Sequence, residues 1–414
     1  MREVFIVGVG MTQFARHLDL SVRDLAVMGV EKALKDADID MGKIQSVFFS
    51  NSNWGYFSAQ QSIRGQVALR DFGLMGIPIT NVENACASGS TALQMAWLNV
   101  ASGLDECSLA VGAEKIYCED KAKMFKSFWG GVDIEQFSRH VEAWRKQMKD
   151  LEDGDLDGAG EKRSPFMDIY SMACRWHMKK YGTTRKQLAV IAAKNHFHGS
   201  MNSNAQFQHK MEIGQILDAP VVTWPLTIPM CAPVGDGGSA AIVCSKSFLK
   251  KVSHARPVKI MASVLGSGTS RTLDEEERDI AVRLSRTAYE TSGIGPEDID
   301  LAEVHDATAF GELHQTEALG FCDPGTGGAL AESGATKLGG RLPVNTSGGL
   351  ESRGHPIGAS GLGQIHEIVT QLRHEAGDRQ VEGCRIGLAE NGGGFLGFEE
   401  AAMGIHILKR TKHI

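Results

Sequence analysis

The sequence predicts an α/β protein built from two similar halves. Short apolar strand segments alternate with helical segments along most of the chain, which is typical of sheets whose strands are joined by helices. Residues 33–44 and 288–299 share alanine and isoleucine positions at one offset of 255 residues, which indicates an internal repeat. A run of 21 uncharged residues, 84–104, predicts a buried helix in the first half.

Composition and charge exclude several classes of function. The chain has 414 residues and a net charge of -7 without a basic block, which argues against nucleic-acid binding. The eight cysteines are scattered and form no metal-binding spacing, so we expect reduced thiols in the cytoplasm. No uncharged stretch suits a membrane span, because residues 84–104 contain too many polar side chains and residues 219–235 contain four prolines. The first residues run directly into a strand, so we expect no signal peptide.

The first half is predicted as strands and helices in alternation, with a largely parallel sheet. Ser21 followed by Asp24 indicates the start of a helix after the first strand. The uncharged run divides into a strand, a sharp turn and a helix that should be buried on all sides. The expected strands are 4–9, 44–49, 79–82 and 108–111, and the later helices are 60–69 and 88–102.

A segment of different character follows, and we expect it to be an insertion. It contains an acidic loop at 150–160, a helix over 168–181, and a helix that begins at a Thr184 capping box and runs to about residue 196. A strand at 240–244 then resumes the first half. The predicted domains are a half formed by 1–118 plus 231–255, a loop domain at 119–230, and a second half at 256–414.

Cys86 is the first candidate for chemistry, because it lies where a strand turns into a helix. Backbone N–H groups and the helix dipole at a helix N-terminus favour a thiolate, so we expect the pKa of Cys86 to fall below the free value of about 8.5. A structural cysteine in the core would fit the same local pattern.

Three further stretches carry residues that are suited to catalysis. His305 and Asp306 end a predicted strand, and His355 lies in the glycine loop 354–361 that opens a helix. Residues 390–394, Glu-Asn-Gly-Gly-Gly, are expected to form a turn after a strand at 385–389. Taken singly, each stretch also fits a core histidine, a structural loop or a tight turn.

Together these motifs resemble the thiolase superfamily, most closely the sterol-carrier-protein thiolases and related acetyl-CoA acetyltransferases. The resemblance covers almost the whole chain. Its strongest motifs are Asn-Ala-Cys-Ala-Ser-Gly at 84–89 and Gly-His-Pro-Ile-Gly-Ala-Ser-Gly at 354–361. It is supported by the stretches at 165–170, 195–205 and 231–237 and by His305-Asp306.

The resemblance implies the thiolase fold, with two βαβαβαββ halves in five α-β-α-β-α layers and the loop domain over the active site. It implies a homodimer or a dimer of dimers. It makes Cys86 the acylated nucleophile and His355 its base, with an oxyanion hole from His355 and His305 and another from the backbone N–H groups of Cys86 and Gly392. Coenzyme A is then a substrate that the loop domain holds, and no metal or redox cofactor is required.

The sequence departs from the family pattern at the second catalytic cysteine. Most thiolases carry that thiol before the glycine run, where this chain has Glu390 and Asn391, or after His-Asp, where it has Ala307. Glu390, His305 or a bound water would then move the second proton. A partly buried carboxyl suits this role because burial raises its pKa.

The expected function is cleavage of a 3-oxoacyl-CoA by free CoA, or the reverse Claisen condensation. The missing thiol leaves three other readings open. In the first reading, the chain is a decarboxylating condensing enzyme with a Cys-His-His site. In the second, it is the thiolase subunit of a complex with a small zinc-ribbon/OB-fold protein, and it acts on an aromatic substrate such as benzoylsuccinyl-CoA. In the third, it is a non-catalytic scaffold subunit.

Overall fold

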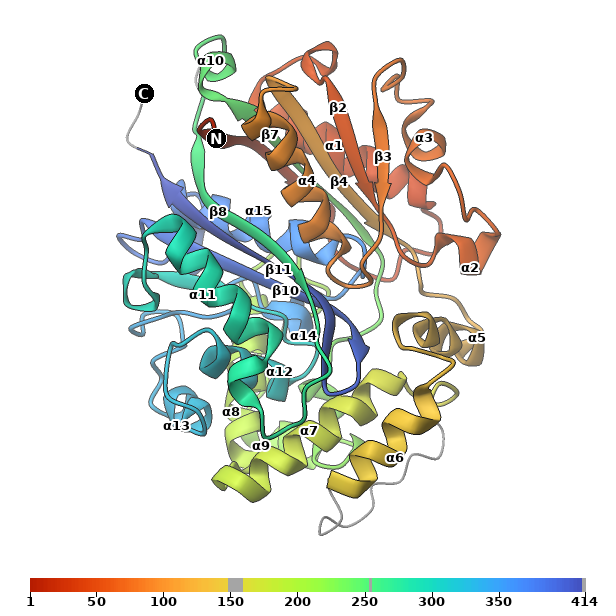
Figure 1. Ribbon diagram of the computed structural model, residues 1–414, viewed down its shortest axis with the longest axis vertical. Coiled ribbons are helices and arrows are strands. Elements are labelled where there is room, and N and C mark those ends of the chain that lie inside the picture. Colours follow the sequence, from red (N-terminus) through yellow and green to blue (C-terminus); the bar gives the residue numbers. More distant parts are fainter. Residues whose placement is uncertain (148–158, 253–254, 412–414) are drawn as a thin grey trace.

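The computed structural model describes residues 1–147, 159–252 and 255–411 (Figure 1). Most of the predicted acidic loop at 150–160 lies outside the described residues. Among the described residues, no helix has both the length and the apolar content that crossing a bilayer requires.

Nine strands form one mixed sheet in the order β3-β2-β4-β7-β1-β8-β11-β10-β9. The two halves of the molecule meet where β1 pairs with β8 at Phe5 and Ile6. The first five strands of this order belong to the N-terminal half and the last four to the C-terminal half. Their bounds are β1 Val4–Met11, β2 Ser46–Ser50, β3 Ile79–Val82, β4 Cys107–Glu114, β7 Gly237–Ser245, β8 Val258–Ser267, β9 Leu301–Glu303, β10 Ile386–Leu396 and β11 Glu399–Arg410.

The prediction of a largely parallel sheet is wrong. Among the strand pairings of this sheet in the described part of the chain, only β2–β3, β2–β4 and β9–β10 are parallel, and the strands at the centre of the sheet pair antiparallel. Strand β7 returns from the long inserted segment, and β10 and β11 form a hairpin joined by two residues, which requires antiparallel pairing.

The helices complete the five predicted layers (Figure 1). Helices α1 and α3 cover the outer face of the N-terminal half, and α11 covers that of the C-terminal half. Helices α4 and α15 lie between the two half-sheets, where Leu93 and Val100 of α4 share one core with Leu362 and Ile368 of α15. The bounds are α1 Val22–Ala37, α2 Trp54–Ser58, α3 Arg64–Leu69, α4 Ser88–Ser102, α10 Lys246–Leu249, α11 Ile280–Ser292, α12 Ala309–Ala318, α13 Gly327–Glu332, α14 Gly349–Arg353 and α15 Ser360–Leu372.

The segment predicted as the loop domain forms helices at one end of the molecule (Figure 1). The capping box at Thr184 is present, with its hydroxyl accepting from the Gln187 N–H. Helix α7 packs its apolar side into a core that also contains Leu313 of α12 and Phe395 of β10. The segment therefore packs on the C-terminal half near the end of β10. Its elements are α5 Lys121–Lys126, α6 Phe137–Gln147, α7 Pro165–Tyr181, α8 Arg185–Gly199, α9 Ile213–Asp218, β5 Val221–Thr223 and β6 Leu226–Thr227.

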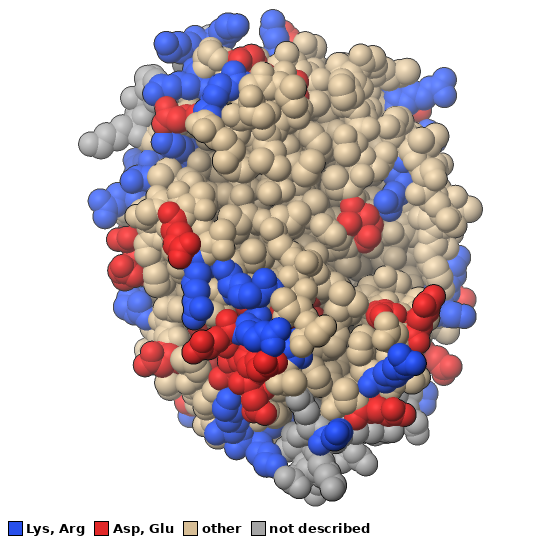
Figure 2. All heavy atoms as spheres, in the orientation of Figure 1, with Lys and Arg blue, Asp and Glu red and all other residues tan. Residues whose placement is uncertain are grey.

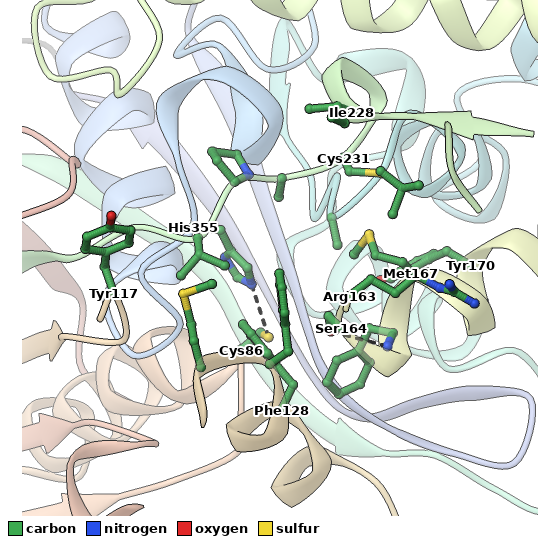
Figure 3. Close-up of a pocket in the computed structure, with 18 of the residues that line it drawn as sticks. Cys86, Tyr117, Phe128, Arg163, Ser164, Met167, Tyr170, Ile228, Cys231 and His355 are labelled. Carbon is green, nitrogen blue, oxygen red and sulfur yellow. Dashed lines mark hydrogen bonds between the residues drawn. The ribbon is translucent and has the colours of Figure 1, made fainter. Parts of the chain in front are cut away.

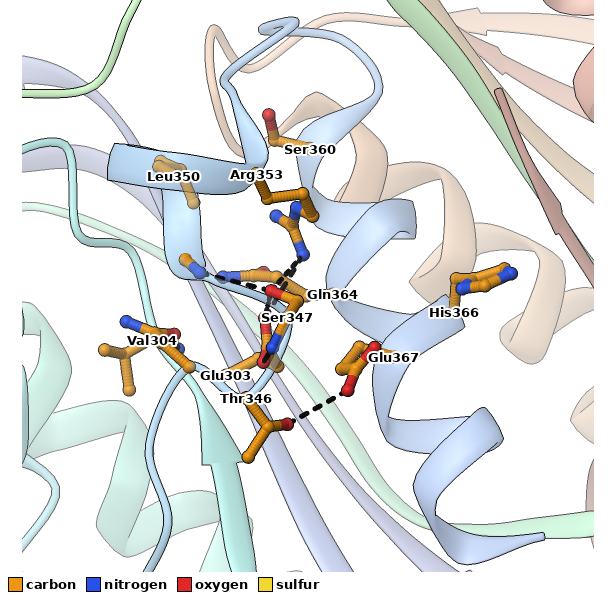
Figure 4. Close-up of polar contacts among 12 residues, drawn as sticks. Glu303, Val304, Thr346, Ser347, Leu350, Arg353, Ser360, Gln364, His366 and Glu367 are labelled. Atoms are coloured by element: carbon orange, nitrogen blue, oxygen red, sulfur yellow. Dashed lines mark hydrogen bonds and ion pairs between the residues drawn. The ribbon is translucent and has the colours of Figure 1, made fainter. Parts of the chain in front are cut away.

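A fully buried ion pair joins the two segments that carry the candidate histidines (Figure 4). Arg353 lies two residues before His355, and Glu303 lies two residues before His305. The Arg353 Nη1 is 3.1 Å from Glu303 Oε2, and both side chains have no exposed surface. Ser347 donates to the same carboxylate from its backbone N–H and its hydroxyl, at 3.0 and 2.6 Å. The pair fixes the two histidine segments relative to each other.

Replacing Arg353 with Met should lower the free energy of unfolding by about 3–5 kcal/mol, because the Glu303 carboxylate would remain buried without its cation. Urea denaturation measures this change. The control is Lys246→Met, which breaks an exposed pair with Glu3 and should cost at most about 1 kcal/mol. Equal losses in the two variants would contradict the special role of the buried pair.

Candidate active site

Cys86 lies on a sharp turn between β3 and α4. Ala85 adopts a left-handed conformation with φ of 46°, and the Ala87 N–H donates to the Asn84 carbonyl at 2.9 Å. Helix α4 begins two residues after the cysteine. The half-buried sulfur of Cys86 lines a cavity. An alanine rarely adopts a positive φ, so the surrounding structure must hold Ala85 in this strained conformation, as is common at functional sites.

The glycine run at 392–394 is part of strand β10, so the predicted turn at 390–394 is wrong. The run continues the pairing with β11 as far as Leu396. Its glycines are needed for close approach: a Cβ on Gly393 would lie 2.3 Å from the Asn84 carbonyl oxygen and 2.4 Å from the Ala87 nitrogen. Strand β10 therefore packs directly against the cysteine turn.

Gly394 lies nearer to the sulfur than the predicted donor, Gly392. The backbone N–H of Gly394 donates toward Cys86 Sγ, and Gly394 also lines the cavity. A Cβ on Gly392 would instead meet the side chain of Glu400 at 2.8 Å. The structure thus favours Gly394 over Gly392 as the donor that strand β10 supplies to a developing oxyanion, together with the Cys86 N–H.

The two predicted histidines lie beside the cysteine, and Figure 3 shows one of them, His355, directed toward Cys86. His355 Nε2 is 3.2 Å from Cys86 Sγ, and the rings of His305 and His355 are 5.2 Å apart between centroids. One nitrogen of each ring and the sulfur all lie within 4.8 Å of one another, a spacing that would also suit a metal ion. The fold thus brings together three residues from a span of 269 positions in the sequence.

Ser360 determines which nitrogen of His355 faces the sulfur. The Ser360 hydroxyl donates to the Pro356 carbonyl at 2.9 Å, so its oxygen is left to accept from His355 Nδ1 at 2.8 Å. The proton of the neutral imidazole is then on Nδ1, and the Nε2 lone pair faces the Cys86 thiol. His355 is arranged as a base toward Cys86. The sequence reasoning missed Ser360, although it belongs to the Gly-His-Pro-Ile-Gly-Ala-Ser motif.

Replacing Ser360 with Ala should lower kcat/KM about tenfold, since one hydrogen bond worth about 1.4 kcal/mol no longer holds the productive tautomer of His355. Steady-state kinetics measures the loss. Ser333→Ala, at the exposed end of α13, is the control and should leave kcat/KM unchanged. An unchanged rate in Ser360→Ala would show that the tautomer does not depend on this hydroxyl.

Asn391 and Glu390 hold the other histidine. The Asn391 amide nitrogen is 3.1 Å from His305 Nδ1, and its oxygen accepts from the Ser90 hydroxyl at 3.2 Å. This arrangement leaves the His305 Nε2–H as a donor. Glu390 accepts the His305 backbone N–H at 2.8 Å and does not line the cavity. Both predicted residues therefore lie at the site and orient His305.

The prediction of a lowered pKa for Cys86 is wrong. Burial raises the pKa of the thiol to about 12, and the nearby carboxylates of Glu114 and Glu83 add to this, against the backbone donors of Gly394 and Cys86. Burial also holds the pKa of His355 well below its ordinary value, helped by His305 and Arg353. The resting pair is therefore a neutral thiol beside a neutral imidazole that can accept its proton.

The comparisons with known proteins decide the family. Residues 4–215 match the family described as "Thiolase, N-terminal domain", and residues 270–409 match "Thiolase C-terminal domain-like". The acetyl-CoA acetyltransferase of Methanothermobacter thermautotrophicus is 36% identical over 413 residues, covering 99% of this chain and all of that protein. The chain belongs to the thiolase family. This thiolase is an acyltransferase with the thiolase fold.

Two further relatives and two solved structures extend this comparison. Rat sterol carrier protein 2 is 36% identical, over 96% of this thiolase and 73% of that protein. The benzoylsuccinyl-CoA thiolase subunit BbsB of Thauera aromatica is 35% identical over 92% of each chain. The structure named "Ltp2-ChsH2(DUF35) aldolase" has a TM-score of 0.77 at 22% identity and covers 100% of this chain and 99% of its own. Human mitochondrial 3-ketoacyl-CoA thiolase in complex with CoA has a TM-score of 0.68 at 17% identity, covering 99% and 98%. The two structures support the fold alone.

A cavity of about 660 Å³ is lined by Cys86, His305 and His355 of this thiolase. Figure 3 shows Cys86 and His355 in its wall. The cations Arg16, Lys121 and Lys162 line it. Other parts of its wall are apolar and largely aromatic. They include Phe128, Phe166, Met167, Tyr170 and Phe395. The cavity can therefore accommodate an anionic ligand that carries an apolar group.

Proposed function

We propose that this thiolase cleaves a 3-oxoacyl-CoA with free CoA through an acyl-Cys86 intermediate, or runs the reverse condensation. The observation that carries the proposal is the 3.2 Å contact between Cys86 Sγ and the unprotonated Nε2 of His355. A thiol becomes a strong nucleophile when a neighbouring base removes its proton during attack.

The proposed first step uses the donors around the sulfur. Cys86 attacks the 3-keto carbon as His355 takes its proton. The oxyanion that forms accepts from the Cys86 and Gly394 backbone N–H groups, while His305 and the protonated His355 hold the thioester oxygen of the leaving enolate, which is that of acetyl-CoA or of a substituted equivalent. Each such donor is typically worth about 3–4 kcal/mol in the transition state.

The cavity supports coenzyme A as the substrate that carries the acyl group. Arg16, Lys121 and Lys162 supply positive charge for phosphate groups. Two of these residues lie in the segment 119–230, which was expected to hold CoA. The mechanism requires no cofactor beyond this substrate.

We propose an aromatic 3-oxoacyl-CoA as the substrate class, with benzoylsuccinyl-CoA as the first candidate. Phe128, Phe166, Tyr170 and Phe395 line the cavity, and their rings suit an aromatic acyl group. The Thauera aromatica relative, whose name contains this substrate, supports the same choice.

We also propose that the molecule forms a homodimer or a dimer of dimers. Helix α4 was predicted to be buried on all sides, yet Gln94, Met95, Trp97 and Leu98 are half-exposed. Figure 2 shows a broad area without charged side chains over the region where Figure 1 labels α4 and β3. The neighbouring β3 is an edge strand of the sheet. A second copy would cover both the apolar helix face and the open strand edge.

A small zinc-ribbon/OB-fold protein is a further proposed partner. The Thauera aromatica relative is named as a subunit, and the similar aldolase structure is named with a second component, ChsH2(DUF35).

The eight cysteines form no disulfide bond, which supports a reducing compartment such as the cytoplasm.

The test is a thiolysis screen over aliphatic and aromatic 3-oxoacyl-CoAs, with and without such a partner. We expect cleavage by free CoA, one acyl group on Cys86 by mass spectrometry, and the highest kcat/KM for an aromatic substrate. The absence of a cysteine at position 307 and at positions 390–391 keeps a decarboxylating condensing enzyme as the alternative. Turnover only with malonyl-type donors would favour that alternative, and no turnover with any donor would favour a scaffold subunit.

A further inference from the structure

The reaction needs a second proton carrier, because the enolate that leaves, of acetyl-CoA or of a substituted equivalent, must be protonated at C2. In this thiolase Ala307 and Glu390 occupy the positions at which the family pattern places a cysteine. We propose that the carboxyl group of Glu400 carries this proton. The inference rests on the proposed thiolysis and names a further residue of the same site.

Glu400 lies in the wall of the cavity that holds the reactive cysteine and both histidines. It is the second residue of β11 and pairs with Phe395 of β10. Its side chain is 4% exposed and passes over Gly392, where a Cβ would lie 2.8 Å from the Glu400 Cγ. The missing side chain at position 392 therefore makes room for this carboxyl.

The other groups in the cavity wall are less suited to exchange a proton at neutral pH. Burial keeps the pKa of the Tyr170 phenol and of the Cys231 thiol far above their ordinary values, so neither gives a base. The Cys118 thiol donates to the Asp120 carbonyl at 3.2 Å, and Glu119 is exposed. Among the described residues that line the cavity, Glu400 is the buried carboxyl.

The surroundings of Glu400 allow both of its protonation states. Burial raises its pKa, and the carboxylate of Asp279 raises it further, while His314 and Arg271 lower it, so that the pKa is about 7. Gln315 lies 3.5 Å from its Oε1. An acid–base group works best when its pKa lies near the working pH, because both forms are then populated.

Glu390 is placed differently, although it was the first candidate from the sequence. Its carboxylate accepts the His305 backbone N–H at 2.8 Å, and it does not line the cavity. Glu390 is therefore a positioning residue for His305, and Glu400 is the carboxyl in the cavity wall.

The proposed cycle balances as follows. Cys86 gives its proton to His355 and bonds to C3 of the substrate, the C2–C3 bond breaks, and its electron pair goes to C2. Protonated Glu400 delivers its proton to C2, which releases acetyl-CoA, or the acyl-CoA with the C2 substituent of the substrate, and leaves a carboxylate. Free CoA then gives its thiol proton to Glu400 and attacks the acyl group. The Cys86 sulfur leaves and recovers its proton from His355.

The experiment separates the two half-reactions. Replacing Glu400 with Gln should slow deuterium uptake at C2 of acetyl-CoA in D₂O by about 10²–10⁴-fold. Acetylation of Cys86 by acetyl-CoA should change far less, because a CoA thiolate with a pKa near about 8.5 leaves without an acid. Glu400→Asp should retain part of the exchange. Circular dichroism of each variant shows whether it is folded.

The matched controls are Glu390→Gln, which alters the support of His305, and Glu119→Gln, which removes an exposed carboxyl. We expect Glu390→Gln to slow exchange and acetylation together, and Glu119→Gln to leave their ratio unchanged. Rapid exchange in folded Glu400→Gln, with normal acetylation of Cys86, would overturn the role of Glu400 and leave the thiolase mechanism intact. No acetylation of Cys86 in the unaltered protein would instead overturn the proposed function.

Discussion

Replacing Cys86 with Ser should lower thiolysis by at least about 10⁴-fold and abolish the acyl-enzyme. A serine hydroxyl is a poorer nucleophile than a thiol, and its oxygen would lie farther from the imidazole nitrogen that the fold places 3.2 Å from Cys86 Sγ. Stopped-flow thiolysis gives the rate, and mass spectrometry of the protein after incubation with acyl-CoA gives the adduct.

The control for this change is Cys322→Ser, which alters a half-buried thiol away from the cavity and should keep full activity. An acyl adduct that persists in the Cys86→Ser protein on another cysteine would contradict the assignment of the nucleophile. Retained thiolysis without any adduct would contradict covalent catalysis.

Replacing His355 with Asn should reduce acylation of Cys86 by about 10²–10⁴-fold. The resting thiol has a pKa raised to about 12, so hardly any thiolate exists at neutral pH without the base. The measurement is the rate at which an acyl-CoA modifies the sulfur. His374→Asn, at an exposed ring, is the control. A rate in His355→Asn close to that of the unaltered protein would mean that another group takes the thiol proton.

The same assignment predicts how acylation depends on pH. Burial lowers the pKa of His355 well below 6.5, so the imidazole stays neutral, and able to accept a proton, to a lower pH than an exposed histidine. Acylation should therefore persist below pH 6.5 and decline only when the pH falls through the lowered pKa. A decline centred near pH 6.5 would show that the imidazole is solvated as an exposed group is.

Local patterns predicted the elements next to the nucleophile well. Strand 79–82 and helix 88–102 have the predicted bounds in the structure, because a sharp change from branched to small residues marks the boundary. The capping box at Thr184 also formed as predicted, since its hydrogen bonds join residues three positions apart. These features depend on neighbours in the sequence.

Features that depend on distant contacts were not predicted. The direction of strand pairing follows from the path of the chain through the inserted segment, which periodicity does not reveal. The glycine run at 392–394 was expected to turn, and it lies instead within strand β10, where Gly393 packs against the cysteine turn. The pKa of Cys86 was predicted from its helix alone, whereas burial by other elements outweighs that helix.

In the candidate site, too, the residues in local motifs were predicted and a residue that depends on distant contacts was not. The motifs identified Cys86, His305 and His355, because each lies in a recognisable stretch of sequence. Glu400 has no such motif: it reaches the cavity only because β11 folds back along β10. A residue of this kind is identified from the register of the paired strands in the folded structure.

The residues that hold the candidate catalytic groups in place differ from many of the residues that line the rest of the cavity, and the close packing at Gly393 belongs to the first set. Strand β10 and the cysteine turn touch through backbone atoms, and the buried pair of Arg353 and Glu303 ties the histidine segments together. The reactive groups are thus held in register before any ligand arrives, and they leave little freedom for change. Much of the remaining cavity wall comes from residues 119–230, and its apolar side chains, such as Phe128 and Met167, take no part in the Gly393 contact or the Arg353–Glu303 pair. New acyl preferences can arise there by ordinary substitution while the inner site is inherited unchanged.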